Sequence, residues 1–138
     1  MSYRKSAFRL DDMCSAILKI QRYVNGYGFE DFIGDEKTQD AVIRQLTIIG
    51  EAVTHLPEAI TSLAPEIPWT SVRGMRNIIV HDYLSVDMRI VWNTVTKDPV
   101  SLGTQLEDLR GRLIDKPKLS DSIRRKALHL RVTFWYYS

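Results

Sequence analysis

The spacing of apolar residues is the feature of this chain that most constrains its fold. Apolar side chains recur from residue 10 to 24 in steps of 3, 4, 3 and 4, and from residue 42 to 56 in steps of 4, 3, 4 and 3. This period places them on one face of an α-helix. Shorter stripes of the same kind follow at 72–79, 88–95 and 102–113. No part of residues 1–115 alternates strictly enough to indicate strands, so the sequence predicts an all-α fold, an up-and-down bundle of four to five helices.

Glycines, prolines and short polar residues mark the expected helix boundaries. We expect the first helix to end near Gly26 and the second to begin after Asp35 or Thr38. Thr70 or Ser71 is the expected N-cap of the third helix, because a hydroxyl oxygen there can accept a backbone N–H of the first turn.

Length and composition indicate one ordinary globular domain. The chain has 138 residues, of which 44% are hydrophobic and 26% charged. The net charge of +2 does not by itself indicate a nucleic-acid-binding protein. Cys14 is the only cysteine, which excludes an internal disulfide and a cysteine-based zinc site, and it is expected to be a small buried hydrophobe. With no apolar run of membrane-spanning length, and with Asp11 and Asp12 near the start, we expect a cytoplasmic protein without membrane contact.

The charge is unevenly distributed, which suggests a division of the chain. Residues 1–100 hold 11 Lys/Arg against 13 Asp/Glu, whereas residues 101–138 hold 8 against 4. We therefore divide the chain into a helical bundle, 1–115, and a basic, aromatic extension, 116–138. Two interpretations of the extension stay open: a last helix or frayed arm on the bundle, or a surface for RNA or a partner protein.

The segment "MRNIIVHDYLSVD", residues 75–87, carries the candidate chemistry. Histidine, here His81, is the side chain best suited to proton transfer near neutral pH, and the fork of Arg76 suits phosphate oxygens. Together they can support metal-free RNA cleavage, in which the ribose 2′-hydroxyl attacks the neighbouring phosphate. Asn77 can orient either group, and Tyr83 can hydrogen-bond to substrate.

The spacing within this segment is unusual for an active site on one helix. Five residues place His81 about 140° around the helix axis from Arg76. Either the helix ends or bends near His81, or a second copy of the chain completes the site. The plain alternative is a histidine at a helix C-terminus, where the helix dipole favours it without any catalysis.

The other two histidines indicate no second site. His55 is expected to be exposed or to cap a helix, and His129 has no identifiable partner in the extension. No His, Asp and Glu cluster has metal-ligand spacing, so we expect neither a metal nor a cofactor.

The chain resembles the HEPN superfamily of small helical RNases, and particularly its HepT-like toxin branch. The resemblance lies in an Arg-x4-His-x-Tyr pattern, formed here by Arg76, His81 and Tyr83. It extends to "TQDAVIRQLTIIGEAV" (38–53), "IPWTSVRGMRNIIVHDY" (67–83) and "VW" (91–92), and covers about residues 1–115 in matching order.

This resemblance implies a homodimer in which two Arg-His motifs meet in a shared cleft. It implies that Arg76 and His81 are catalytic and that Asn77 supports them. It also implies a partner, a minimal nucleotidyltransferase antitoxin, which transfers AMP from ATP to Tyr83 or simply covers the cleft. Asp82 and Glu51 are candidates for supporting the site; for Glu51 a solvated helix carboxylate is the plain alternative.

Two functions follow as expectations. The first is a dimeric, metal-independent endoribonuclease toxin, neutralised by its antitoxin, with AMPylation of Tyr83 as one expected route. The alternative is a non-catalytic HEPN subunit that binds a nucleotidyltransferase. A purely structural helical bundle is a third interpretation, for which substitution of Arg76 or His81 has no effect.

Overall fold

The computed structural model describes residues 3–80, 87–97 and 99–114, and every regular element in these ranges is an α-helix. The long helices are α1 (Tyr3–Tyr23), α3 (Glu36–Thr54), α5 (Trp69–Val80) and α7 (Pro99–Ile114). The shorter ones are α2 (Phe29–Ile33), α4 (Glu58–Thr61) and α6 (Met88–Thr96). The all-α prediction is confirmed. The described ranges hold seven helices rather than four to five, because α2 and α4, of five and four residues, are too short to produce an apolar stripe.

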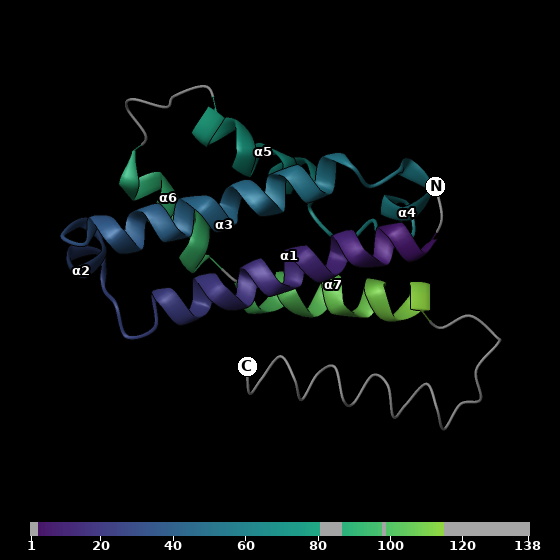
Figure 1. The fold of residues 1–138 in the computed structure, drawn as a ribbon, viewed down its shortest axis with the longest axis horizontal. Helices are drawn as coiled ribbons and strands as arrows, with labels where there is room; N and C mark the ends of the chain where they lie inside the picture. The colour runs from purple at the N-terminus through teal and green to yellow at the C-terminus, as the bar shows by residue number, and fades with distance from the viewer. Residues whose placement is uncertain (1–2, 81–86, 98, 115–138) are drawn as a thin grey trace.

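The four long helices alternate in direction, so the up-and-down topology is confirmed (Figure 1). Helix α3 packs against both α1 and α5, while α7 packs against the other side of α1. The spatial order is therefore α7, α1, α3, α5. Helices α2 and α6 lie together at the end of the bundle where α3 begins.

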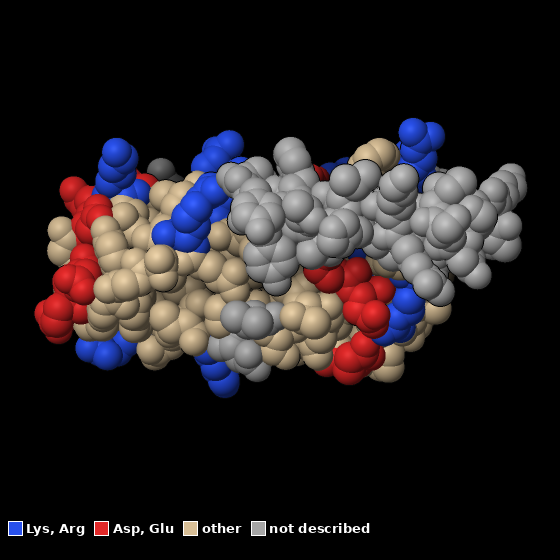
Figure 2. All heavy atoms as spheres, turned by 90° about the horizontal axis from the view of Figure 1, so that it is seen from below, with Lys and Arg blue, Asp and Glu red and all other residues tan. Residues whose placement is uncertain are grey.

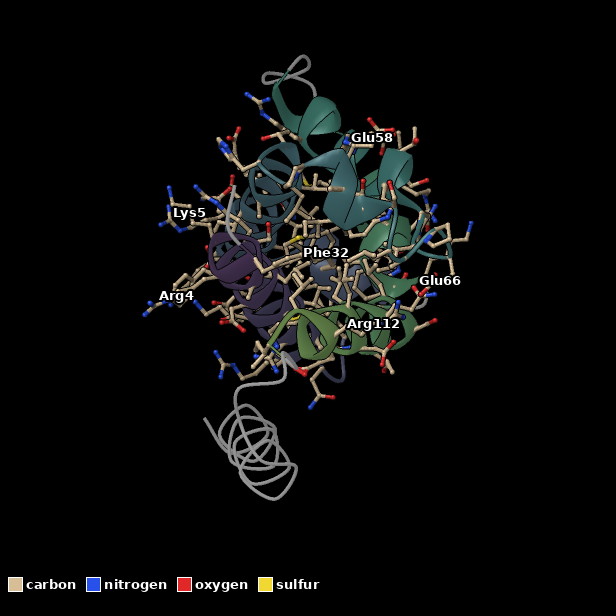
Figure 3. All side chains as sticks on the ribbon, turned by 90° about the vertical axis from the view of Figure 1, so that its right-hand side faces the viewer. Arg4, Lys5, Phe32, Glu58, Glu66 and Arg112 are labelled. Carbon is tan, nitrogen blue, oxygen red and sulfur yellow. The ribbon has the colours of Figure 1, made fainter. Side chains whose placement is uncertain are left out.

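The core consists of the predicted stripes. Phe32 of α2 is fully buried, and Figure 3 shows it at the centre of the bundle with the labelled charged side chains pointing outward. The buried stripe residues are Leu10, Met13, Ile17, Ile20, Val42, Leu46, Ile49, Val53, Leu56, Val72, Val91, Val95, Leu106, Leu109 and Leu113. Cys14 is buried as predicted. The period of 3 and 4 thus identified the buried face of each long helix.

Asp35 starts α3, as predicted. Its carboxylate accepts hydrogen bonds from the Thr38 backbone N–H at 3.1 Å, the Thr38 hydroxyl at 2.6 Å and the Tyr27 hydroxyl at 2.6 Å. These bonds, the Thr38 hydroxyl foremost, lower the pKa of Asp35 to about 2. Helix α1 ends at Tyr23, and the chain then turns through Gly26, whose φ of +78° is accessible to glycine at little cost.

The prediction that Thr70 or Ser71 caps α5 was wrong. The helix already begins at Trp69, and the backbone N–H of Val72 donates to the Pro68 carbonyl at 3.0 Å. Both hydroxyl residues therefore lie inside the first turn, where they are exposed. The bond from Val72 to Pro68 is the ordinary first hydrogen bond of an α-helix, so α5 begins before the two hydroxyl residues instead of after one of them.

The indole of Trp69 fixes the start of α5 to the preceding loop. Its Nε1–H lies 3.0 Å from the carbonyl oxygens of both Thr61 and Ala64, and the side chain is buried. A buried N–H needs such an acceptor, because leaving it unpaired costs free energy. These bonds set where α5 starts along α3, and hence which residues of the two helices meet.

A buried arginine joins α7 to α1. The Arg110 side chain is 1% exposed and donates to the carboxylates of Asp11 on α1 and Glu107 on α7. On α1 near this arginine, the pKa of the Cys14 thiol is raised to about 12, mainly by burial; the charges of Glu107 and Asp11 also raise it, and Arg110 lowers it. No residue pattern indicated that this arginine would be buried.

No described helix is both long and apolar enough to cross a membrane. On the face shown in Figure 2, acidic side chains gather at the end that holds α2, and Lys and Arg are scattered over the described surface. Glu30 and Asp31 of α2 and Glu36 of α3 belong to the first turns of these helices at that end. Residues 116–138 lie outside the described ranges, so the division at residue 115 stays a prediction.

Candidate active site

Arg76 and Glu51 form an ion pair where α5 crosses α3. Arg76 Nε lies 2.6 Å from Glu51 Oε1, and the two side chains are 41% and 45% exposed. The Nε atom itself is buried and lacks the geometry of a hydrogen bond, so proximity of opposite charges is what links the two groups. The structure thus places Glu51 beside Arg76, and its role in supporting the site stays a prediction.

The pairing leaves the outer edge of the guanidinium open. Among the described residues, Glu51 is the partner that the structure gives to Arg76, and the ion pair joins Glu51 Oε1 to Arg76 Nε. The two Nη atoms form a fork that can bind two oxygens of one phosphate. A half-exposed side chain held at Nε therefore presents a fixed cation to an incoming anion.

Gly50, the residue before Glu51, lies directly against Arg76, and the sequence analysis did not single it out. A Cβ built on Gly50 would lie 2.5 Å from Arg76 Cβ and 3.0 Å from its backbone nitrogen. The backbones of α3 and α5 can approach this closely only because the side chain is absent. The available signal was a glycine inside a regular amphipathic stripe, which often marks a close approach.

The remaining predicted site residues are not tested by the structure. Asn77 lies on α5, but its side chain is outside the described set, as are His81, Asp82 and Tyr83 entirely. His81 immediately follows Val80, the last described residue of α5. The assignment of catalysis to Arg76, His81 and Asn77, of modification to Tyr83 and of support to Asp82 therefore remains a prediction.

The prediction for His55 is confirmed: it is exposed and forms the C-cap of α3. His129 lies beyond the described part of the chain. Within the described ranges, no group of three or more His, Cys, Asp or Glu side chains is arranged to hold a metal ion.

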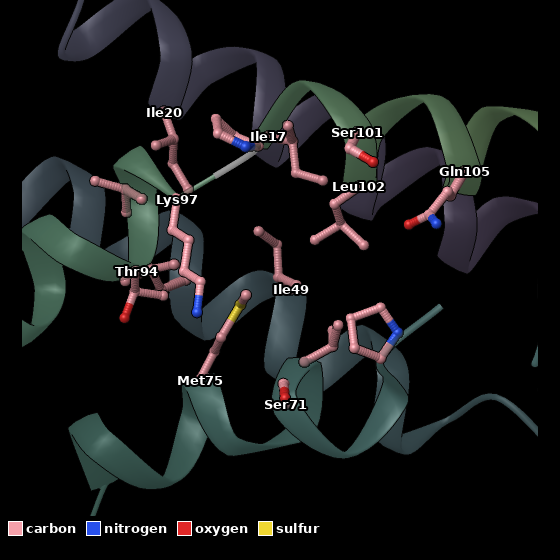
Figure 4. A pocket seen from close by; sticks show the side chains of 15 residues that line it. Ile17, Ile20, Ile49, Ser71, Met75, Thr94, Lys97, Ser101, Leu102 and Gln105 are labelled. Atoms are coloured by element: carbon pink, nitrogen blue, oxygen red, sulfur yellow. The ribbon is translucent and has the colours of Figure 1, made fainter. Parts of the chain in front are cut away.

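A cavity of about 530 Å³ opens between α5 and α7, but it is separate from the ion pair. Its floor is apolar, formed by Ile17, Ile20, Leu46 and Ile49. Neither Arg76 nor Glu51 lines it, although Met75 does. Figure 4 shows Met75 and Lys97 extending toward one another across it. An apolar floor of this kind offers little to a phosphate, so we place the chemistry at the α3–α5 crossing instead.

Comparison with known proteins identifies the family. A family described as "Ribonuclease HepT-like" matches residues 13–109, which include the whole Arg-x4-His-x-Tyr segment together with Gly50 and Glu51. The chain belongs to the HepT-like ribonuclease family. The matched range ends before residues 116–138, in agreement with the absence of any family pattern there.

Individual relatives agree with this assignment. A protein of Thermococcus cleftensis named "Probable ribonuclease HepT" is 46% identical over 101 residues, which cover 73% of this chain and 92% of that protein. Two others are named provisionally as RNases. One, from Caldanaerobacter subterraneus, is 38% identical over 62% of this chain and 77% of its own length. The other, from Methanocaldococcus jannaschii, is 34% identical over 74% of this chain and 88% of its own length. No solved structure matches the chain significantly.

Proposed function

We propose that this protein is an endoribonuclease toxin that works as a homodimer and needs no metal ion. The observation that carries the proposal is the Arg76–Glu51 pair, which lies within the family-matched range and holds a half-exposed guanidinium by its Nε. Arginine in this state supplies a permanent positive charge and a planar pair of donors for a phosphate. Relatives named as ribonucleases favour RNA as the source of that phosphate.

The proposed reaction is transfer of a phosphodiester to the neighbouring 2′-hydroxyl. His81 takes the proton from the 2′-oxygen as the O2′–P bond forms, and the P–O5′ bond breaks. The departing 5′-oxygen receives a proton from an imidazolium, which leaves a 2′,3′-cyclic phosphate and a 5′-hydroxyl. Arg76 stabilises the extra negative charge on the phosphoryl oxygens in the transition state, and Asn77 orients the reacting groups.

The dimer is part of the proposal because of the helical geometry. Arg76 and His81 are about 140° apart around an ideal helix axis, so one straight helix does not direct both at the same phosphate. Two motifs placed across a two-fold axis can supply arginine from one chain and histidine from the other. Each half of the shared cleft then receives groups from both copies.

A minimal nucleotidyltransferase is the proposed antitoxin. Transfer of AMP from ATP forms a bond between the Tyr83 phenolic oxygen and the α-phosphorus, releases pyrophosphate and frees the phenolic proton. The adduct places a bulky anion two residues from His81 in the chain. Near Arg76 it competes with the RNA phosphate by both charge and volume.

The direct test is RNA cleavage by purified protein in excess chelator. We expect cleavage that yields 2′,3′-cyclic phosphate ends, and no cleavage of an RNA carrying 2′-deoxyribose at the cut position. His81→Ala should abolish the reaction while leaving the helical circular dichroism intact. Cleavage retained by His81→Ala, or equal cleavage of the deoxy-substituted RNA, contradicts the proposed mechanism.

The partner is tested separately by coexpression with a nucleotidyltransferase. Intact mass of this chain should increase by one AMP for each transfer, and Tyr83→Phe should remove the increment. An unmodified Tyr83 beside an active partner contradicts the AMPylation step. Growth arrest without the partner, lost on substituting Arg76 or His81, distinguishes a toxin from a subunit that only binds a nucleotidyltransferase.

A further inference from the structure

Gly50 occupies a position where its conformational freedom is not used. It is buried in the interior of α3, and the one described glycine with a positive φ is Gly26. Glycine weakens a helix interior relative to alanine, because the unfolded backbone loses more conformational entropy on folding. The presence of glycine at position 50 of α3 therefore needs a steric explanation.

That reason is the contact with Arg76. A Cβ on Gly50 would lie 2.5 Å from Arg76 Cβ, 3.0 Å from its nitrogen and 3.1 Å from its Cα. All three atoms belong to the backbone or to the root of the side chain, so none can move without moving α5. Two glycines of other helices differ: a Cβ on Gly74 meets nothing within 4 Å, and one on Gly103 meets a methyl of Ile17 at 3.6 Å.

We propose that Gly50 is a positioning residue for the guanidinium of Arg76. It fixes the backbone of Arg76 against α3, while the adjacent Glu51 reaches the Nε end of the same side chain at 2.6 Å. Two consecutive residues thus position Arg76: Gly50 contacts its backbone and Cβ, and Glu51 contacts its guanidinium. The proposal rests on the proposed function, in which that guanidinium binds the scissile phosphate.

Alanine at position 50 must push the helices apart at this crossing. Carbon atoms in contact normally lie about 3.5–4.0 Å apart, so α5 has to move by about 1 Å. A misplacement of that size at a catalytic group can lower a rate by about 10²-fold. For Gly50→Ala we expect kcat to fall by between about 10-fold and 10²-fold with little change in KM, because Arg76 acts mainly on charge that develops in the transition state.

Gly74→Ala is the matched control, since it adds the same methyl group to α5 itself, two residues before Arg76, where space is free. It should cleave RNA at the native rate. A second readout is independent of activity: the ¹⁵N–¹H signal of Arg76 Nε, a buried atom beside Glu51, assigned by its loss in Arg76→Lys. Gly50→Ala should shift or broaden this signal, and Gly74→Ala should not.

The outcomes separate this proposal from the proposed function. If the native protein does not cleave RNA but Gly50→Ala alone disturbs the Nε signal, the function is wrong and the positioning role stands. If Gly50→Ala matches Gly74→Ala in both kcat and the signal, the positioning role is overturned. If Gly50→Ala does not fold, the contact is tested in the native protein by nuclear Overhauser effects between the Gly50 Hα protons and the Arg76 Hα and Hβ protons. Their presence supports the proposal, and their absence refutes it.

Discussion

Two arginines, each joined to a carboxylate of another helix, show how differently the two sides of this bundle use the same chemistry. Arg110 joins α7 to α1, is 1% exposed and is held by both Asp11 and Glu107. Arg76 joins α5 to α3, is 41% exposed, and has one described carboxylate partner at its Nε. The first charge is enclosed and neutralised, and the second is held at one end and open at the other.

The difference matches the proposed function, in which the α1–α7 side stabilises the fold and Arg76 binds the RNA phosphate. A buried arginine held by two carboxylates, as Arg110 is, cannot be offered to a ligand without breaking the interface around it. A half-exposed arginine contributes little to stability, because water screens its ion pair. The electrostatic cost of keeping Arg76 fixed near the surface is small, and its terminal nitrogens remain able to bind an anion.

The largest effect on stability should come from Arg110→Ala. It leaves two carboxylates next to each other at the α1–α7 interface, and breaking a buried pair in this way costs about 3–5 kcal/mol in the free energy of unfolding. Urea denaturation monitored by circular dichroism measures the loss. Arg112→Ala, two positions on, removes an exposed arginine that contacts Glu66 and Asp108 and should cost much less. Equal losses in the two variants contradict the contrast.

The opposite result is expected for Arg76→Ala. Removing one donor to a transition-state oxyanion typically lowers kcat by about 10²–10³-fold. The free energy of unfolding should change by less than about 1 kcal/mol, since the pair with Glu51 is exposed. Arg73→Ala, an exposed arginine three residues earlier on the same helix, is the control for charge alone. If Arg73→Ala loses as much activity as Arg76→Ala, the effect comes from net charge and not from the guanidinium of Arg76.

The pH dependence of the free energy of unfolding tests whether Cys14 stays buried on the α1–α7 side of the bundle. Because burial raises the thiol pKa from 9.0 to about 12, its contribution to stability is complete below pH 9 and is lost as pH rises toward 12. Near pH 10.5 the native protein should lose about 1–2 kcal/mol more than Cys14→Ala, relative to pH 8. Thiol titration at pH 8 should detect Cys14 only after denaturation. Rapid labelling of the folded protein would show that this side opens readily.

The smallest effect is expected for Glu51→Gln, which keeps the shape of the side chain and removes its charge. The free energy of unfolding should change by less than about 1 kcal/mol. RNA cleavage should fall by about tenfold or somewhat more, because Arg76 loses the anion that holds its Nε. Glu58→Gln, on α4 and exposed, is a control for loss of one negative charge. Unchanged cleavage in Glu51→Gln would show that Glu51 is a solvated carboxylate that does not position Arg76.

Local sequence patterns predicted most of the fold. The apolar period identified the buried face of each long helix, and Asp35 correctly marked the start of α3, because a short carboxylate can accept the N–H of Thr38 within the same turn. The start of α5 was misplaced, because the helix begins at Trp69, whose indole N–H is held by the backbone carbonyls of Thr61 and Ala64. Backbone carbonyls carry no sequence signature, so such a boundary is not visible in the residue types.

The candidate site, too, was predicted only in part from the sequence. Arg76 and His81 were identified from side-chain chemistry and from the family pattern, and the family is confirmed by the comparisons. The partnership of Arg76 with Glu51 was at most one of two interpretations, and the contact of Gly50 was not anticipated. Both depend on which residues of α3 and α5 meet, a register set by contacts between residues far apart in the chain.

By itself, then, the sequence determined the helical class, the buried faces and the chemical groups available, because these follow from residue type and from spacing within one helix. The tertiary structure decided which arginine is enclosed and which is open. Arg110 and Arg76 are alike as residues, and each lies near apolar stripe positions. Only the packing of α7 on α1, and of α5 on Gly50 of α3, makes one a structural ion pair and the other a candidate for binding phosphate.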